Sequence, residues 1–235
     1  MHHTENPYNR LAAAVQELLE GKDLDEISVR DITEKCGMTR QVFYHYFSDK
    51  YALVSWVHNV KFAQILQKEE YRDVEDVLLL LLNYIEANKT YFLHIYTSQD
   101  QNALPTLILD EQKRVMTAAV QYLTGRAPND HMLFLIGVYA DTIQNQIQKC
   151  LLVKRGGASA WLLHRDLRDA CPVGLASVLH GKRIPKQVIL DAIPGRPRTE
   201  QLPAVPFPFK KCFQSALCKN QLWQMQKKRR FFCHQ

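Results

Sequence analysis

The sequence contains no long apolar segment. Its most apolar run extends only from Val77 to Leu82, whereas a membrane-spanning helix needs about 20 apolar residues. The N-terminus, from Met1 to Pro7, lacks the apolar core of a secretory signal. Cysteine is scarce, with 6 in 235 residues, and a chain that is not exported keeps its thiols reduced. We therefore expect a cytoplasmic protein that contacts no membrane and has no disulfide scaffold.

Spacings typical of metal and catalytic sites are also absent. No Ser/His/Asp, Cys/His or paired-carboxylate arrangement has a spacing that would support catalysis. The acids Glu69-Glu70 and Asp110-Glu111 are adjacent, so the members of each pair would point to different faces of a helix. The C-terminal cysteines and histidine do not have the spacing of a zinc motif: Cys212, Cys218, Cys233 and His234. We therefore expect no metal, no cofactor and no enzymatic activity.

Acidic residues are rare in the last third of the chain. Residues 1–150 carry 14 Lys and Arg against 20 Asp and Glu, whereas residues 151–235 carry 16 against 4. Prolines rise from 3 to 7 across the same boundary. The net charge of +6 is thus the sum of a negative charge on the first part and a larger positive charge on the second. The two parts have the compositions of different kinds of polypeptide.

The first 150 residues have the periodicity of an all-helical protein. Apolar residues recur three and four positions apart, and no segment alternates like a strand that leads into a hairpin turn. Gly21, Gly37 and Gly125 each follow a predicted helix, where glycine is a common stop. The predicted helices cover about residues 11–19, 28–36, 39–47, 49–66, 73–87, 88–97, 106–124 and 130–150.

Two of these helices, 28–36 and 39–47, are short and flank a turn at Gly37. This is the sequence form of a helix-turn-helix, because glycine permits the left-handed backbone that such a turn requires. The second helix of the unit enters the major groove with its N-terminal residues at the base edges. Arg pairs well with guanine and Gln with adenine, so the candidate base contacts are Thr39, Arg40 and Gln41.

Other polar residues of this region are suited to the DNA backbone. Tyr44 and His45 lie one turn further along and carry donors for phosphate oxygens. Lys50 opens the next predicted helix, where its charge and the free backbone N–H groups can meet a phosphate. Ser28 can cap its own helix or bond a phosphate, and the sequence leaves both open. We expect Tyr46 and Phe47 to hold the short helix from inside.

The stretch from Ile32 to Lys50 resembles the DNA-binding signature of TetR-type (TetR/AcrR) transcriptional regulators. That signature consists of a helix, a glycine turn, a small hydroxyl residue, a Phe-Tyr pair, an aromatic-Phe pair and a lysine that opens the next helix. Trp56 and residues 88–92 are similar to the dihydroxyacetone kinase regulator branch of the family. The resemblance extends over about residues 8–150 and is far more specific in its DNA-binding part.

The resemblance implies a sequence-specific transcription regulator that binds double-stranded DNA as a homodimer on a pseudo-palindromic operator. Residues 1–50 would form a three-helix DNA-binding domain and residues 51–150 a helical effector and dimerisation domain with an incomplete C-terminal part. Whether the effector is a small molecule or a protein stays open. The candidate pocket residues are mostly aromatic: Tyr84, Tyr91, Phe92, His94, Tyr96, Met116, Tyr122, Phe134 and Tyr139.

Residues 151–235 depart from the family pattern. TetR-type regulators usually end in two long helices, and only the first, residues 130–150, is predicted here. Glycine or proline interrupts nearly every later stretch of the sequence, which predicts an irregular basic tail. It would be a basic appendage that adds affinity for DNA, a disordered segment or an out-of-frame translation from about residue 150. The last explains the abrupt change in composition best, and predicts little contribution to the core.

Two other classes of protein compete with a regulator. A helical enzyme or ligand carrier could use the same scaffold, but the sequence offers no catalytic spacing. A protein-interaction module without DNA binding would need a damaged recognition helix, and the intact segment 39–50 argues against it.

Overall fold

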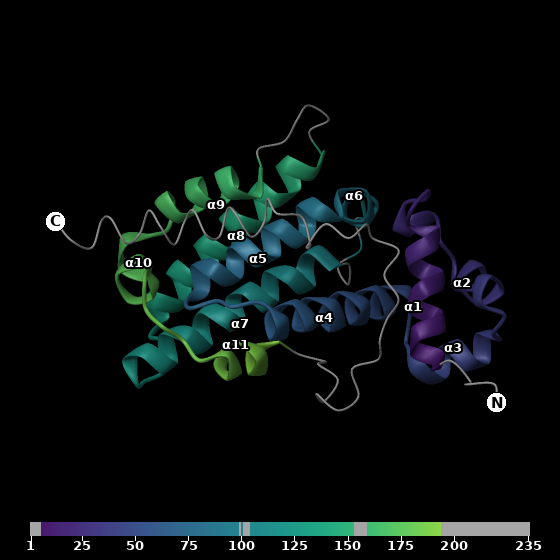
Figure 1. Ribbon diagram of the computed structural model, residues 1–235, viewed down its shortest axis with the longest axis horizontal. Coiled ribbons are helices and arrows are strands. Elements are labelled where there is room, and N and C mark those ends of the chain that lie inside the picture. Colours follow the sequence, from purple (N-terminus) through teal and green to yellow (C-terminus); the bar gives the residue numbers. More distant parts are fainter. Residues whose placement is uncertain (1–5, 99, 101–103, 153–158, 194–235) are drawn as a thin grey trace.

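The computed structural model describes residues 6–98, 100, 104–152 and 159–193 (Figure 1). Within these ranges the chain is helical and has no strand, so the all-α prediction is confirmed. No helix of the described part is long and apolar enough to cross a membrane. The helices are α1 Pro7–Leu18, the 3-10 helix η1 Leu24–Glu26, α2 Val29–Cys36, α3 Arg40–Tyr46, α4 Lys50–Lys68, α5 Val74–Ala87, α6 Lys89–Tyr96, α7 Leu104–Thr124, α8 Asp130–Leu152, α9 Ala160–Asp169, α10 Val173–Leu179 and α11 Lys186–Ala192.

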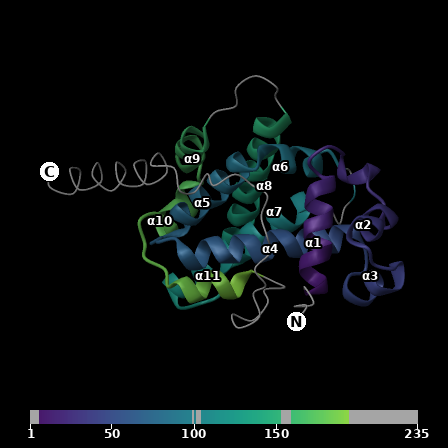
Figure 2. The ribbon, with the colours of Figure 1, turned by 45° about the vertical axis from the view of Figure 1, so that its right-hand side comes forward.

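Helices α1, α2 and α3 lie together at one end of the molecule (Figures 1 and 2). Their apolar residues turn toward one another, and Leu11, Ile32 and Phe43 are fully buried. Helix α2 has 8 residues and α3 has 7, and helices of that length are unstable in isolation. The shared core therefore keeps both of them folded.

Helix α4 belongs to both ends of the molecule. It packs against α1 and also against α5, α7 and α11, and Figure 1 shows it running from the three-helix end into the body. Tyr8 of α1 stacks on Trp56 of α4 with ring centroids 5.2 Å apart, and Phe47 meets Tyr8 edge-on at 5.6 Å. The position of the three-helix end relative to the body thus depends on α4.

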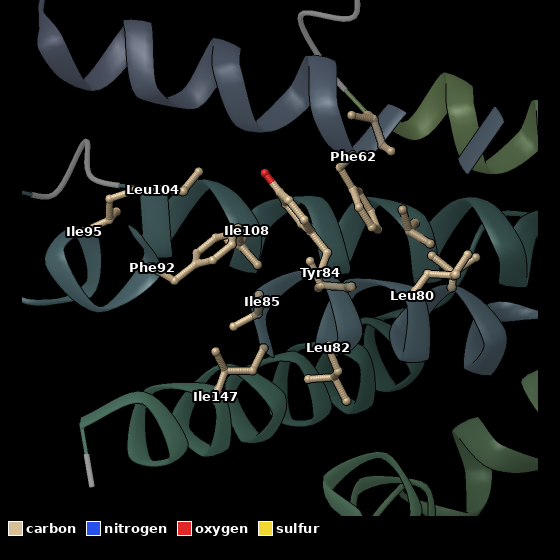
Figure 3. Close-up of a cluster of buried hydrophobic side chains, with 14 of the residues drawn as sticks. Phe62, Leu80, Leu82, Tyr84, Ile85, Phe92, Ile95, Leu104, Ile108 and Ile147 are labelled. Atoms are coloured by element: carbon tan, nitrogen blue, oxygen red, sulfur yellow. The ribbon is translucent and has the colours of Figure 1, made fainter. Parts of the chain in front are cut away.

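The apolar run from Val77 to Leu82 lies in α5 and is buried throughout. Helix α9 covers α5, and α4, α6 and α7 also pack on it. Figure 3 shows Leu82 pointing toward Ile147 of α8, whereas Tyr84 points toward Phe62 of α4. A helix that is apolar around its whole circumference is typical of a core position, so α5 is the central helix of the body.

Three short helices after Leu152 correct the expectation of an irregular, poorly packed segment. Helix α9 packs on α5, α10 packs on α7 and α8, and α11 packs on α7 and α4. Seven aliphatic residues of this segment are buried: Leu167, Leu175, Leu179, Ile184, Ile189, Leu190 and Ile193. Residues 159–193 therefore contribute to the core, against the prediction from composition.

The prediction failed here because these helices are only 10, 7 and 7 residues long. Two or three apolar residues stabilise such a helix once an existing core supplies the other half of the contact. Pro172 and Pro185 lie just outside α10 and α11, where they do not interrupt either helix. The out-of-frame origin stays a hypothesis. Residues 194–235, including Cys212, Cys218, Cys233, His234 and the terminal basic run, lie outside the described residues.

Candidate nucleic-acid interface

Helix α3 presents a polar face to the outside. Arg40, Gln41, Tyr44 and His45 are exposed, with Tyr44 at 57%. Within the described part of the chain none of the four side chains makes a hydrogen bond. On the opposite side of the helix Phe43 is fully buried. The structure therefore brings these predicted DNA contacts together on one surface, with their donors and acceptors open to a partner.

The beginning of α3 is fixed by its cap. Thr39 is the N-cap, and its side-chain oxygen accepts a hydrogen bond from the Val42 N–H at 3.3 Å. Thr39 itself is exposed, and this contact uses only the acceptor capacity of its hydroxyl, because a hydroxyl also has a donor. Thr39 thus positions the helix and still has a proton to donate.

The turn between α2 and α3 is held from α1. Gly37 has φ 63°, in the left-handed region that glycine adopts without strain. The Arg10 guanidinium of α1 donates a hydrogen bond to the Cys36 carbonyl, just before this turn. The Met38 N–H then donates to the Thr33 carbonyl at 2.9 Å. These contacts set the angle at which α3 leaves α2.

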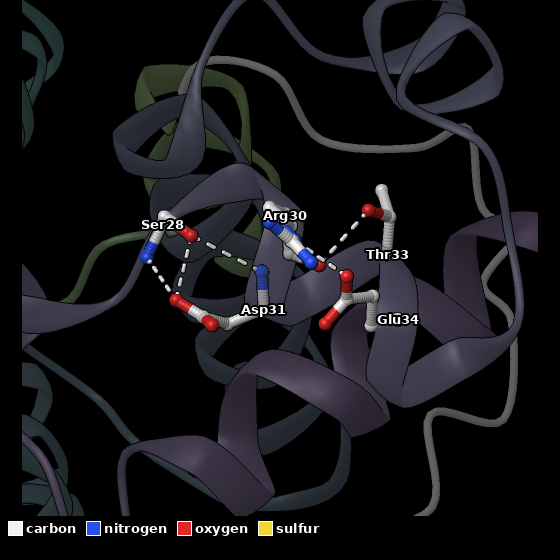
Figure 4. A network of polar contacts seen from close by, with 5 residues as sticks. All are labelled: Ser28, Arg30, Asp31, Thr33 and Glu34. Atoms are coloured by element: carbon white, nitrogen blue, oxygen red, sulfur yellow. Dashed lines mark hydrogen bonds and ion pairs between the residues drawn. The ribbon is translucent and has the colours of Figure 1, made fainter.

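The beginning of α2 is closed by a capping box (Figure 4). The Ser28 hydroxyl donates to Asp31 Oδ2 at 2.6 Å and the Ser28 N–H donates to the same atom at 2.8 Å. These hydrogen bonds lower the pKa of the Asp31 carboxyl, so it stays ionised. Arg30 pairs with Glu34 at 2.5 Å on the next turn. Of the two roles left open for Ser28, the geometry supports the cap.

Lys50 is placed differently from the prediction. Its Nζ donates to the carbonyl oxygens of Leu24, Asp25 and Ile27 at 2.7, 3.2 and 2.9 Å. An ammonium group has three donors, so all of them are engaged in binding the segment around η1. These contacts give Lys50 a role in the fold, and its phosphate contact stays a prediction.

A polar contact joins α6 to the segment around η1, which we call the α6–η1 contact. His94 Nδ1 lies 2.5 Å from Asp23 Oδ1, and the Ser98 hydroxyl donates to Asp25 Oδ1 at 2.7 Å. The Tyr51 hydroxyl of α4 reaches the same Asp25 oxygen at 3.1 Å. His94 is therefore engaged with Asp23 instead of lining a pocket. No local pattern in the sequence indicates a pairing 71 positions apart.

The candidate pocket residues separate into three groups. Tyr84, Tyr91, Phe92 and Tyr96 are buried in the core. Burial raises the pKa of each of the three phenols, so all three are neutral. Tyr122 and Phe134 are 51% and 64% exposed, and their place in a pocket stays a prediction. Both lie where α7 leads into α8, on the outside of the body.

The remaining two, Met116 and Tyr139, do line a cavity in the body. Its wall also contains Glu111 and Gln112 of α7, which the prediction missed. Glu111 lies three positions after the buried Ile108 and four before the buried Val115. That spacing marks an acid on the inner face of a helix and was the available signal.

Comparison with known proteins identifies the class of the three-helix end. Residues 11–56 match the family of bacterial regulatory proteins named the tetR family. These residues span α1, the helix-turn-helix of α2 and α3, and the first part of α4. Over these residues the chain is similar to the tetR family, and the resemblance seen in the sequence is confirmed.

A relative and a solved structure extend the comparison beyond this domain. The chain is 30% identical over 115 residues, 44% of its length, to the HTH-type dhaKLM operon transcriptional activator DhaS of Lactococcus lactis subsp. lactis (strain IL1403). It spans 62% of that relative. A solved structure of the dihydroxyacetone kinase operon activator DhaS shares the fold with a TM-score of 0.52 and 23% identity, over 73% of this chain and 95% of that one.

Proposed function

We propose that this chain is a sequence-specific DNA-binding transcription regulator. The observation that carries the proposal is the exposed polar face of α3, set in a domain of the tetR family. The relative that matches 44% of the chain is named a transcriptional activator, which supports the same activity here. The proposed place of action of this chain is the cytoplasm, where bacterial DNA lies, and we assign this chain no catalytic role.

In this proposal some residues of α3 contact bases and others contact phosphates. Arg40 and Gln41 lie in its first turn and contact base edges in the major groove, where bidentate contacts to guanine and adenine give sequence preference. Thr39, at the N-cap, lies beside these two residues at the base edges. Tyr44 and His45 donate to phosphate oxygens, which fix the register of the helix on the duplex. Residues 1–50 form the DNA-binding domain, and the body from residue 51 onward forms the effector and dimerisation domain.

An apolar face on α8 supports a homodimer. Phe134 and Val138 lie one turn apart and are 64% and 42% exposed, with Leu133 beside them at 45%. Tyr122, at the end of α7, is 51% exposed. Contiguous exposed apolar residues commonly mark an interface, and a second copy of this chain is the occupant that a two-fold operator requires. Each subunit then offers one α3 to one half-site.

Binding to the DNA upstream of the chain's own gene tests the proposal. Fluorescence anisotropy titrations should give tighter binding to that DNA than to random DNA of equal length. Arg40→Ala should weaken specific binding by about 1–3 kcal/mol and relax the sequence preference. Arg114→Ala removes the same charge from an exposed position on α7 and should leave binding unchanged.

Two outcomes would contradict this assignment. Equal affinity for specific and random DNA would show that binding is electrostatic and independent of sequence, and such binding depends steeply on salt. Absence of DNA binding by a folded protein would favour the competing class, a protein-interaction module on the same scaffold. The open donors on α3 argue against that class, because a module without DNA has no use for them.

A further inference from the structure

A cavity of about 60 Å³ lies in the body of the molecule, mainly between α5 and α7. Residues of α4, α8 and the segment from Cys171 to Ile193 complete its wall. Most of the wall is apolar, with Phe62, Leu78 and Val115 among its side chains. A water-sized group needs about 10–15 Å³ of such space, so the cavity holds roughly four to six non-hydrogen atoms.

Two neighbouring polar side chains of α7 line this apolar space. Glu111 is 5% exposed, and within the described structure its Oε1 makes no hydrogen bond. Both polar atoms of the Gln112 side chain, Nε2 and Oε1, are buried and also lack a hydrogen-bond partner among the described residues. Buried polar atoms in proteins nearly always have such a partner. Three such atoms from two consecutive residues line this cavity and offer hydrogen bonds to a ligand.

The protein orients the carboxylate of Glu111 from its other side. Glu111 Oε2 lies 3.4 Å from Nε2 of His58, which is fully buried on α4. The His58 ring packs against the rings of Phe62 and Tyr84, with each pair of centroids 5.8 Å apart. The second carboxylate on the wall, Glu75, is engaged by Arg168 at 3.3 Å and His180 at 3.7 Å. Glu111 is therefore the acid available to a ligand.

We propose that this cavity binds a small primary carboxamide with a short alkyl chain. Glu111 Oε1 and Gln112 Oε1 are acceptors and Gln112 Nε2 is a donor. A primary amide offers the complement, two N–H donors and one carbonyl acceptor. It pairs reciprocally with the Gln112 carboxamide and donates its second N–H to Glu111, while the alkyl chain contacts the apolar wall.

Other small polar groups match this set less well. A hydroxyl has one donor, an ammonium has no acceptor, and a carboxylate has no donor. A carboxylate would also place a second negative charge beside Glu111, and the described lining contains no Lys or Arg to offset it. An ammonium would leave Gln112 Nε2 unpaired and would have to lose its hydration in a mostly apolar cavity.

A series of four probes of similar size tests the proposal on the full chain: butyramide, butan-1-ol, butylamine and butyrate. In calorimetric titrations or ligand-observed NMR, butyramide should bind about tenfold more tightly than each of the others. Glu111→Gln removes one acceptor and Gln112→Leu removes a donor and an acceptor. Each change should weaken butyramide binding about fivefold or more. Asp110→Asn, at an exposed position one residue earlier on α7, should leave binding unchanged.

Equal binding of the four probes, or binding that neither variant weakens, would overturn the proposal. Failure of every probe to bind would show a cavity that holds water only, and would overturn it as well. Should Glu111→Gln fail to fold, as judged by circular dichroism, Gln112→Leu and the probe series decide the matter. The proposal rests on the effector domain of the proposed function, but these titrations contain no DNA. A failed operator experiment therefore leaves their result standing.

Discussion

At the scale of single residues, the side chains that face outward from α3 differ from those that hold it in place. Arg40 and Gln41 make no hydrogen bond with any described residue, whereas Lys50 donates to three backbone carbonyls around η1. Both kinds of residue are polar and lie within one short stretch of sequence. What separates them is the set of partners that the fold brings to each side chain.

The replacement of Lys50 by Met should therefore destabilise the fold. Hydrogen bonds from a charged group contribute about 1.5–3 kcal/mol, and the variant leaves three carbonyl groups of the η1 segment without their donor. Urea unfolding should show a loss of that size. Lys35→Met is the matched control, because Lys35 forms an exposed pair with Glu17 at 2.8 Å, and such pairs contribute less than about 1 kcal/mol.

The opposite result for Lys50→Met would support a phosphate contact by Lys50. If Lys50→Met unfolded like the parent protein but lowered the salt dependence of DNA binding by about one unit, Lys50 would be a backbone contact. The sequence predicts a phosphate contact and the hydrogen bonds of the structure indicate a role in the fold, so unfolding and salt dependence together distinguish the two roles.

At the scale of elements, the α6–η1 contact joins the body to the DNA-binding domain. His94 of α6 meets Asp23, and the backbone next to Asp23 accepts the hydrogen bonds of Lys50. A displacement of α6 is therefore transmitted directly to the segment that precedes α2. No element of the body except α4 offers a comparable link within the contacts described above.

A double-mutant cycle on His94→Ala and Asp23→Ala should detect this link. The two unfolding free energies should be non-additive by about 0.5 kcal/mol or more, because residues in direct contact couple by such amounts. The comparison pair is Lys113 and Asp141, 3.5 Å apart on the surface of α7 and α8, for which we expect weaker coupling. Additive effects at His94 and Asp23 would remove the proposed connection.

Truncation tests the helices that composition did not predict. A chain that ends at Leu152 loses seven buried aliphatic side chains and uncovers α5. Each such side chain contributes about 1.5–3 kcal/mol when buried, and whole domains are stable by only about 5–15 kcal/mol. That fragment should melt far below the full chain and aggregate. A chain that ends at Ile193 keeps all the packing described here and should melt like the full protein.

The helices differ in how far sequence alone predicts them. For α2 and α3 every signal was local: a capping serine, a glycine turn and apolar residues at helical spacing. For α9, α10 and α11 the apolar residues are few, and the helices depend on α5, α7 and α8, which lie far away in sequence. The positions of Lys50 and His94 were missed for the same reason, since their partners lie 23 to 26 and 71 residues away.

At the scale of the whole molecule, the proposed dimer depends on the apolar face of α8. The double variant Phe134→Glu with Val138→Glu places charges where a second copy would pack. Light scattering on a sizing column should then report a monomer, with weakened operator binding. Thr106→Glu adds a charge at an exposed position near the start of α7 and should leave the dimer intact. A monomeric parent protein would contradict the proposed assembly.

The arrangement of α3 has a consequence for how operator preference can change over time. Its support comes from Phe43, the cap at Thr39 and the turn at Gly37, while the side chains proposed to read DNA lie on the other side. Gene duplicates could exchange Arg40 and Gln41 and acquire new target genes without refolding. Because of the same separation, the exposed face of α3 can be redesigned to bind an engineered promoter while the body and its cavity stay unaltered.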